Sequence, residues 1–199
     1  MAARRGALIL AAGASQRMGT PKALLAWGGT TLLEYTVQQA HAALTDVMDV
    51  IVVVLGPATH HLAASLGDVR VAFNLEPKSG RSASLRIGCE AMPEDVLSVV
   101  VQSVDQPCPA DVLSALFAAV EQRTKEVAVP SFQGRRGHPV CFAGSFLPEL
   151  RRVTEEEEGL RSLVRRHALH LVAVPVDSES VLWNLNDPAA YAAAQAHAE

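Results

Sequence analysis

The chain contains little cysteine, and its cysteines show no metal-binding arrangement. The three residues, Cys89, Cys108 and Cys141, lie far apart, without a CxxC pair or a cysteine–histidine cluster. Neither a zinc site nor a disulfide framework is therefore indicated. We expect the three side chains to be structural thiols in a reducing cytosol.

The sequence also lacks a surplus of basic residues. It has 17 lysines and arginines against 21 aspartates and glutamates, a net charge of −4. A nucleic acid or an anionic membrane would favour a basic surplus, so neither partner is expected. Any phosphate chemistry must therefore come from a local site.

Long hydrophobic runs are missing as well. No stretch reaches the ~18 apolar residues of a membrane span. Residues 4–12 begin like a signal peptide, but their apolar run is shorter than the ~7–15 residues required, and polar Gln16-Arg17 follow. We therefore expect a soluble, cytoplasmic protein.

What the sequence does contain is a regular alternation of strand and helix patterns. Hydrophobic residues make up 49% of the 199 residues, enough for a sizeable core. The alternation predicts βαβ units in one three-layer, Rossmann-like α/β domain, residues 1–199, with a mostly parallel central sheet. Ligands of such folds bind outside the carboxyl ends of the strands. The predicted strands cover residues 7–12, 50–55, 69–74, 96–104, 127–130, 139–142 and 171–176, and the predicted helices cover residues 31–44, 59–66, 81–91, 110–123, 159–167 and 188–196.

The most informative segment is LAAGASQRMGTPK, residues 10–22, where a predicted strand runs into a loop. The small residues Gly13, Ser15 and Gly19 let backbone N–H groups approach an anion closely. The planar guanidinium of Arg17 can donate hydrogen bonds to phosphate oxygens, and Lys22 supplies a compact positive charge. The loop is neither a Walker motif nor a GxGxxG fingerprint. An ordinary glycine turn with solvated cations is the alternative, but the joint pattern favours a polyphosphate site.

Asp105 ends the predicted valine-rich strand at the edge where ligands gather. An aspartate beside a polyphosphate is a natural Mg²⁺ ligand, because Mg²⁺ favours one or two carboxylates together with substrate phosphates. Pro107 stiffens the exit from the strand. The alternative is a helix N-cap, in which Asp105 or Asp111 satisfies backbone N–H groups.

Two further segments offer polar side chains. Ser82 and Ser84 open a predicted helix whose N-terminus favours an anion or a base carbonyl, although a simple capped amphipathic helix is an equal alternative. Arg135, Arg136 and His138 lie in a glycine-rich loop that suits a phosphate-bearing acceptor or a lid. A solvated turn with a structural histidine is the alternative for this loop.

At these residues the chain resembles the MobA-like nucleotidyltransferases. Their signature is a strand ending in LAAG or LAGG, followed by x-S-x-R-M-G-x-x-K-x-L, which residues 10–24 match. The resemblance implies the nucleotide-diphospho-sugar transferase type of fold. It spans nearly the whole chain in the family's order, at residues 84–88 (SLRxG), 105–107 (DQP), 134–140 (GRRGHPV), 159–161 (GxR) and 184–188 (NxNxP).

The resemblance also implies roles for particular residues. Arg17, Lys22 and Asp105 are catalytic, with Asp105 matching the aspartate that holds Mg²⁺ and Asn186 at a second metal position. Arg135 and His138 lie on the acceptor side. The implied nucleotide-binding residues are Leu10, Ala11, Ala12, Gly13, Ser15, Ser82 and Ser84.

The motifs point to two branches of the family. Ala12 and the segment GHPV, residues 137–140, resemble the molybdenum cofactor cytidylyltransferases, whereas Asn184-x-Asn186 resembles the guanylyltransferases. Many members carry DxDTP where this chain has Asn184-x-Asn186. The amide oxygen of an asparagine can ligate Mg²⁺ but adds no charge. Asp187 could supply a charge, but it lies one place out of register. The run Glu155–Glu158 is expected to be solvated or to lie near the N-terminus of the next helix, with Glu157 where the family has an acidic residue.

The resemblance therefore implies a Mg²⁺-dependent transfer of CMP from CTP onto the terminal phosphate of molybdopterin or molybdenum cofactor. Lys22 would stabilise charge at the α-phosphate and Arg17 charge on the leaving pyrophosphate. A client molybdoenzyme is a further partner. One alternative is a guanylyl- or other nucleotidyltransferase with a different phosphorylated acceptor. Another is a non-catalytic chaperone that binds molybdenum cofactor.

Overall fold

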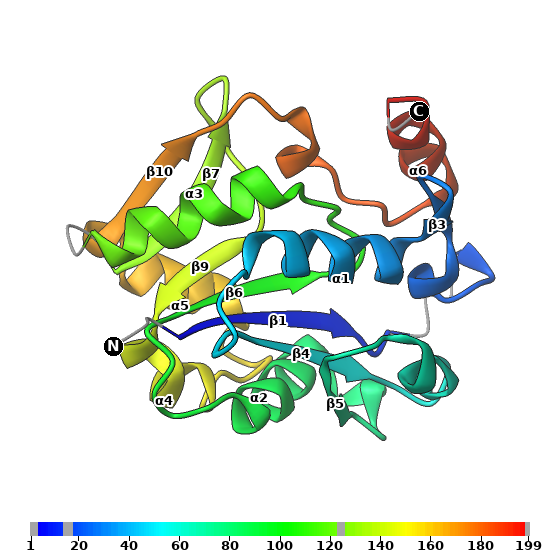
Figure 1. The fold of residues 1–199 in the computed structure, drawn as a ribbon, viewed down its shortest axis with the longest axis horizontal. Helices are drawn as coiled ribbons and strands as arrows, with labels where there is room; N and C mark the ends of the chain where they lie inside the picture. The colour runs from blue at the N-terminus through cyan, green and yellow to red at the C-terminus, as the bar shows by residue number, and fades with distance from the viewer. Residues whose placement is uncertain (1–3, 14–17, 123–125, 198–199) are drawn as a thin grey trace.

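A central sheet organises this computed structural model, which describes residues 4–13, 18–122 and 126–197. The strands follow the order β10-β7-β9-β6-β1-β4-β5, and β8 pairs with β7 (Figure 1). Their bounds are β1 (Arg5–Ala11), β4 (Val50–Leu55), β5 (Arg70–Phe73), β6 (Ser98–Ser103), β7 (Val127–Phe132), β8 (Arg135–Arg136), β9 (Val140–Ala143) and β10 (Leu171–Pro175).

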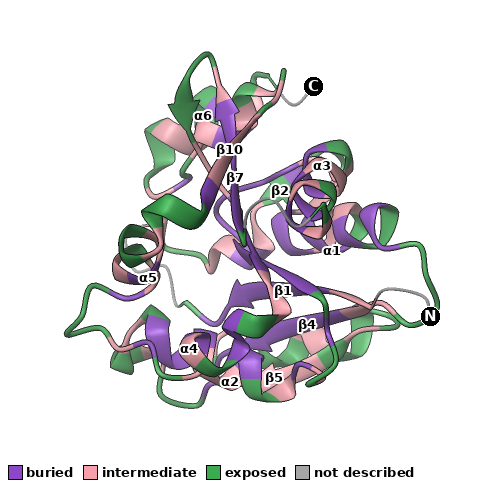
Figure 2. Cartoon of the chain, turned by 90° about the vertical axis from the view of Figure 1, so that its left-hand side faces the viewer, coloured by how far each residue is buried: buried purple, intermediate pink, exposed green. Residues whose placement is uncertain are grey.

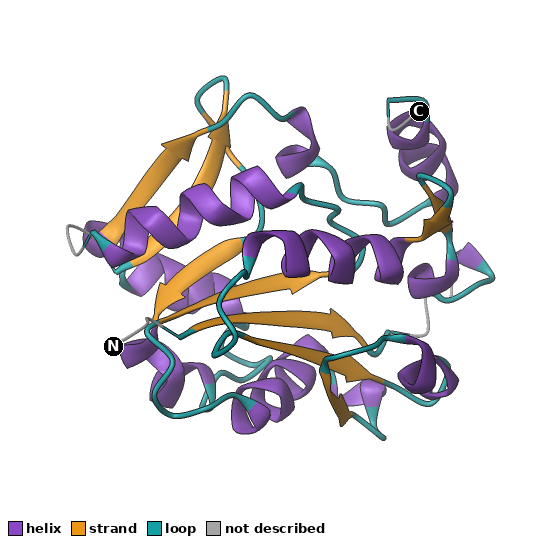
Figure 3. Ribbon diagram, viewed as in Figure 1, coloured by secondary structure: helices purple, strands orange, loops and turns teal. Residues whose placement is uncertain are grey.

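Most neighbouring strands of the sheet are parallel. β1 pairs in parallel with both β4 and β6, and its residue Leu10 lies beside Val54 on one side and Ser103 on the other. These three strands therefore end at one edge of the sheet (Figure 3). β9 is antiparallel to both β6 and β7. The expected α/β fold with a mostly parallel sheet is confirmed.

Helices cover both faces of the sheet (Figure 1). One face packs against α1 (Leu32–Ala43) and α3 (Ala110–Glu121), and the other packs against α2 (Arg81–Ala91), α4 (Leu147–Leu150) and α5 (Leu160–Arg166). The last helix, α6 (Pro188–Gln195), lies beside a small hairpin of β2 (Ala26–Trp27) and β3 (Thr30–Thr31). The 3₁₀ helices that the structure describes with full bounds are η2 (Lys22–Leu24), η3 (His60–Ser65), η4 (Pro77–Ser79), η5 (Gly144–Phe146), η6 (Ala168–His170) and η7 (Glu179–Leu182).

The side chains of β1 divide between the two faces. Ala7, Ile9 and Ala11 belong to the core under α1 and α3, whereas Leu8 and Leu10 belong to the core over α2. Successive strand residues point to opposite faces, so a strand covered on both sides must be apolar throughout. Figure 2 shows the buried strands between the two helix layers.

Capping residues in the sequence mark the N-termini of α1 and α6. The hydroxyl of Thr31 accepts from the backbone N–H of Glu34, whose carboxylate accepts from the N–H of Thr31, a complete capping box for α1. α6 begins with Pro188, and the Asp187 carboxylate accepts from the N–H of Ala190 at 2.9 Å. Proline at the first helical position loses no helix hydrogen bond.

Some elements differ from the expectation. The short helix expected at residues 59–66 is a 3₁₀ helix over residues 60–65. The four-residue α4 and the two-residue strands β2 and β3 were not expected, because elements this short show neither a helical nor a strand period.

The three cysteines are buried and unbonded. Burial raises the pKa of Cys89 to about 12 and raises the pKa values of Cys108 and Cys141 as well. The thiols are therefore protonated, in line with a structural role. Within the described part of the chain, no helix has the length and apolar character needed to cross a membrane.

Candidate active site

Three residues expected to act together lie in contact at the carboxyl edge of β1 and β6. The Lys22 ammonium donates to Oδ2 of Asp105 at 2.7 Å and to Oδ1 of Asn186 at 2.5 Å. The Lys22 side chain is 14% exposed and that of Asp105 7% exposed, so the ion pair is largely screened from water. The negative charge of the buried Asp105 carboxylate is thus compensated by the Lys22 ammonium, which also donates to the amide oxygen of Asn186.

The backbone holds Asp105 in place. The Asp105 carbonyl accepts from the backbone N–H of Leu185 at 2.9 Å, which ties the end of β6 to the segment carrying Asn186. Asp105 is not a helix cap, because α3 begins after Pro109. Asp187 does cap a helix, since its carboxylate accepts from the first turn of α6. The structure thus brings Asn186, and not Asp187, to Asp105.

The strand that leads into the first loop is fixed by two residues that sequence reasoning missed. The Thr59 hydroxyl is buried and donates to the Ala11 carbonyl at 3.1 Å. A Cβ on Gly56 would lie 2.4 Å from the Ala12 carbonyl oxygen, so glycine alone permits this close approach. Leu10, Ala11 and Ala12 are buried and Gly13 is exposed. The predicted residues Ser15 and Arg17 lie outside the described residues.

The two serines expected at the nucleotide lie in the first turn of α2. Both are almost fully buried, and the Ser84 hydroxyl accepts from the side-chain amide of Asn74 at 2.9 Å. The backbone N–H of Ser82 donates to Oε1 of Glu155 at 2.5 Å. The serines therefore anchor this turn in the structure, and their contact with a nucleotide stays a prediction.

Glu155 is exposed, as expected for a solvated run, but its carboxylate meets the N-terminus of α2 rather than that of the next helix, α5. Its carboxylate satisfies a free N–H at the N-terminus of α2, where negative charge is stabilising. Gly80, with φ +92°, lies against it, and a Cβ there would come within 2.3 Å of Glu155 Cγ. Sequence reasoning missed this contact because 73 residues separate its partners. Glu157 is exposed.

His138 lies among charged groups from three segments. Its backbone N–H donates to the Val181 carbonyl at 2.8 Å. Burial lowers the pKa of His138, the positive charges of Arg81 and Arg161 lower it further, and Asp105 opposes them. The ring is therefore neutral near pH 7. Sequence reasoning left Arg81 and Arg161 without roles, although Arg161 stands in the GxR motif.

The other residues expected on the acceptor side lie on a short strand. Arg135 and Arg136 form β8 and are exposed, with Arg135 paired to Phe132. The structure thus keeps Arg135 on the surface and brings His138 into the neighbourhood of Asp105.

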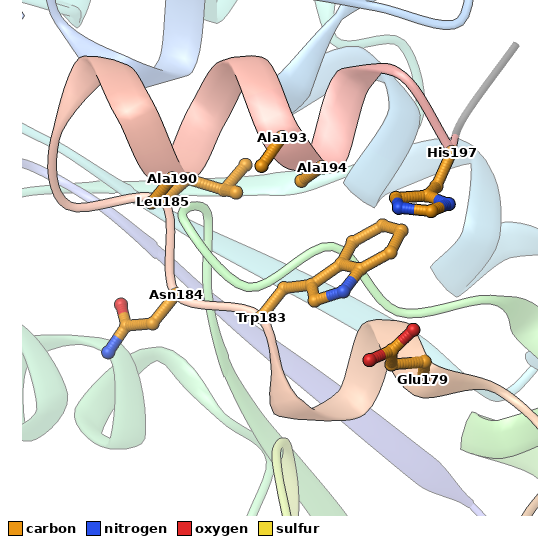
Figure 4. Close-up of a pocket in the computed structure, with 8 residues that line it drawn as sticks. All are labelled: Glu179, Trp183, Asn184, Leu185, Ala190, Ala193, Ala194 and His197. Atoms are coloured by element: carbon orange, nitrogen blue, oxygen red, sulfur yellow. The ribbon is translucent and has the colours of Figure 1, made fainter.

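A separate cavity of about 320 Å³ lies between η7 and α6. The Trp183 indole forms one wall, and Figure 4 shows it between Glu179 and His197. Trp183 also packs edge-on against Trp27, with ring centroids 6.0 Å apart. Asn184 and Leu185 line this cavity and directly precede Asn186 of the active site in the chain.

The donor set near Lys22 fits a hard cation. A carboxylate oxygen and an amide oxygen already converge on one positive charge, and oxygen ligands of this kind suit Mg²⁺. Among residues 4–13, 18–122 and 126–197, no three histidine, cysteine, aspartate or glutamate side chains gather as a metal-binding group. The remaining ligands of a cation here would come from substrate phosphates and water.

The profile of the MobA-like NTP transferase domain matches residues 7–171. The chain therefore belongs to the MobA-like NTP transferase family, as its motifs indicated. It is a nucleotidyltransferase of this type.

Three relatives are similar over much of the chain. Nicotine blue oxidoreductase of Paenarthrobacter nicotinovorans is 28% identical over 169 residues, 80% of either chain. Molybdenum cofactor guanylyltransferase of Rhizobium johnstonii is 29% identical over 91% of this chain and 87% of its own. 2-C-methyl-D-erythritol 4-phosphate cytidylyltransferase of Streptomyces coelicolor is 34% identical over 64% of this chain and 51% of its own.

Solved structures share the fold. Rv0371c from Mycobacterium tuberculosis has a TM-score of 0.83 at 27% identity, over 98% of this chain and 99% of that one. A complex of Rv0371c with manganese has a TM-score of 0.77 at 24% identity, over 97% and 98% of the two chains. The nucleotide-diphospho-sugar transferase type of fold is thereby confirmed.

Proposed function

We propose that this protein transfers CMP from CTP to the terminal phosphate of molybdopterin or molybdenum cofactor and releases pyrophosphate. The observation that carries the proposal is the joint contact of Lys22 with Asp105 and Asn186, in a chain of the MobA-like family. This cluster offers one positive charge and two oxygen ligands at the edge of the sheet where β1 leads into the nucleotide loop.

The reaction forms one P–O bond and breaks another. An oxygen of the acceptor phosphate attacks the α-phosphorus, and the bond to the bridging oxygen of the β-phosphate breaks, so the electron pair leaves with pyrophosphate. The attacking oxygen is already anionic and needs no strong base. Catalysis is then positioning and charge neutralisation, with Lys22 at the α-phosphate and Arg17 at the leaving group.

Asp105 and Asn186 are the residues that would hold Mg²⁺. A bound Mg²⁺ neutralises charge on the triphosphate. Their joint contact with one ammonium supports this assignment. The manganese complex of the similarly folded Rv0371c supports a divalent ion in this fold.

The acceptor phosphate would bind on the side of His138. Arg81 and Arg161 supply positive charge there, and both act on the imidazole of His138. Arg135 would reach the acceptor from β8. Ser82 and Ser84 would hold the nucleotide through the first turn of α2. The name of the Rhizobium relative supports molybdenum cofactor as the acceptor.

The choice of nucleotide has support on both sides. Ala12 and the GHPV segment favour CTP, as does the cytidylyltransferase from Streptomyces. The second candidate is GTP, favoured by Asn184-x-Asn186 and by the guanylyltransferase from Rhizobium. We further propose a single domain that acts in the cytoplasm and delivers its product to a molybdoenzyme.

The test is pyrophosphate release from purified protein with Mg²⁺, molybdopterin and each of CTP, GTP, ATP and UTP in turn. We expect release with CTP. Release with GTP alone would transfer the assignment to the guanylyl branch. If no pyrophosphate is released with any of the four nucleotides, the molybdopterin assignment is overturned. That result would favour another phosphorylated acceptor, a cofactor-binding chaperone, or chemistry of the kind named for the oxidoreductase relative.

Two variants test the site within the same assay. Lys22→Ala and Asp105→Asn should each lower pyrophosphate release by about 100-fold or more, because each removes charge that acts on the transition state. Lys78→Ala changes an exposed lysine of η4 and is the matched control. Near-normal release by a folded Lys22→Ala or Asp105→Asn protein would remove that residue from the mechanism.

A further inference from the structure

The Lys22 ammonium lies between the two oxygens that are proposed to hold the divalent ion. Its distances of 2.7 Å to Asp105 and 2.5 Å to Asn186 are those of short, charge-assisted hydrogen bonds. The partners come from segments 83 and 164 residues away, so three separate parts of the chain converge on this one charge.

Asp105 and Asn186 have short side chains, whereas the side chain of Lys22 is long and flexible. The Asp105 carbonyl accepts from Leu185 N–H, and Asn186 N–H donates to the Asn184 carbonyl at 2.8 Å. Both side chains therefore start from tied backbone. The backbone of Lys22 is also held, because its carbonyl accepts from Leu25 N–H at 3.1 Å. The flexible four-carbon stem of Lys22 is thus the part that can leave the cluster.

The net charge of the cluster determines how strongly it can bind a free metal ion. Asp105 contributes one negative charge, Lys22 one positive charge, and Asn186 none, so the cluster is neutral. A divalent cation that took both oxygens would take the ammonium's position between them, and two cations this close repel each other strongly at a partly buried site. Free metal therefore gains little from a cluster that Lys22 already neutralises.

A nucleoside triphosphate changes this balance. Its phosphates carry several negative charges and attract the Lys22 ammonium more strongly than one carboxylate does. We propose that Lys22 is the resident counter-ion of Asp105 and Asn186 in the free protein, and that it yields these oxygens to a divalent cation only when a triphosphate draws it away. The proposal rests on the proposed function. It gives Lys22, besides its place at the α-phosphate, a second role that orders the entry of metal and nucleotide.

The test measures the affinity of the nucleotide-free protein for Mn²⁺. The electron paramagnetic resonance signal of free Mn²⁺ reports how much of the ion stays unbound. Lys22→Met removes the ammonium and keeps an unbranched side chain. We expect the variant to bind Mn²⁺ about tenfold more tightly than the unchanged protein, because the competing charge is gone. Equal or weaker binding by folded Lys22→Met would overturn the proposal.

Three further variants make the result specific. Lys78→Met removes an exposed lysine by the same substitution, and Mn²⁺ binding must stay unchanged. The double variant Lys22→Met with Asp105→Asn must lose the gain; if it keeps the gain, the ion binds elsewhere and the proposal is wrong. Lys22→Gln replaces Lys22→Met should the latter not show a cooperative melting transition.

The outcome is separable from the proposed function. Tight Mn²⁺ binding by Lys22→Met, with no pyrophosphate release by the unchanged protein, would overturn the molybdopterin assignment and leave the cation exchange standing. Pyrophosphate release by the unchanged protein, with no gain in Mn²⁺ affinity in Lys22→Met, would overturn the cation exchange and leave the proposed function standing.

Discussion

His138 is half-buried, and charged groups of both signs act on its imidazole. Burial has the largest effect and lowers its pKa; Arg81 and Arg161 act in the same direction, and Asp105 acts against them. The folded state thus favours the neutral ring more than the unfolded chain does. The stability that follows is present above the ordinary histidine pKa and is lost as pH falls through the lowered pKa.

This sign gives a prediction about pH. The melting temperature should fall between about pH 7 and about pH 5, and His138→Gln should reduce that fall, because the variant has no imidazole to protonate. Melting followed by circular dichroism at several pH values measures the difference. His41→Gln, at an exposed position of α1, is the control and should melt with the unchanged protein's pH dependence. An identical fall in His138→Gln and the unchanged protein would show that this ring does not contribute.

At the scale of elements, Gly88 shows how closely α2 packs on the sheet. A Cβ at this position would lie 2.2 Å from Cδ1 of Leu8 and 2.8 Å from Cγ2 of Val54. Leu8 and Val54 are fully buried, so neither can turn away into solvent. The glycine of the SLRxG motif is therefore explained by contact between α2, β1 and β4, without any ligand.

Gly88→Ala should destabilise the protein by about 1–2 kcal/mol. Overpacking of this severity costs about 2–3 kcal/mol, and alanine returns about 1 kcal/mol through its higher helix propensity. Urea unfolding measures the change in the free energy of unfolding. Glu90→Ala, on the exposed side of the same helix, should stay within about 0.5 kcal/mol of the unchanged protein. A Gly88→Ala protein as stable as the parent would mean that α2 can shift away from the sheet.

Elements whose signals lie inside their own segment could be predicted from the sequence. The strand at residues 50–55 and the helix at residues 81–91 have the expected bounds. The antiparallel direction of β9 could not be predicted, because it depends on pairing of Val140 with Val101, far along the chain. Direction within a sheet is a tertiary property that no local pattern encodes.

The same distinction holds in the site. Lys22 and Asp105 could be singled out because each follows a strand that ends at the ligand-binding edge. The hydrogen bond from Ser82 to Glu155 could not, since the glutamate lies in a charge run that is equally typical of a solvated segment. Side chains that act through a distant partner need the fold before their role is visible.

At the scale of the whole molecule, positive charge is concentrated against the overall balance. The chain carries a net charge of −4, yet Lys22, Arg81 and Arg161 surround the edge of the sheet near Asp105 and His138. An anionic nucleotide is attracted by this local field and not by the protein's total charge. The site should therefore bind a triphosphate with its metal more strongly than an uncharged nucleoside.

Binding of this kind must raise the stability of the whole fold. A ligand that binds only the folded chain adds about 2.7 kcal/mol at 100 times its Kd, which for a chain of this length corresponds to about 5–11 °C in melting temperature. We expect CTP with Mg²⁺ to give such a shift in differential scanning fluorimetry. Cytidine at the same concentration should give almost none, because it lacks the phosphates that meet the positive charge. Equal shifts with CTP and cytidine would place recognition in the base alone, and no shift with any triphosphate would contradict a nucleotide site at this edge of the sheet.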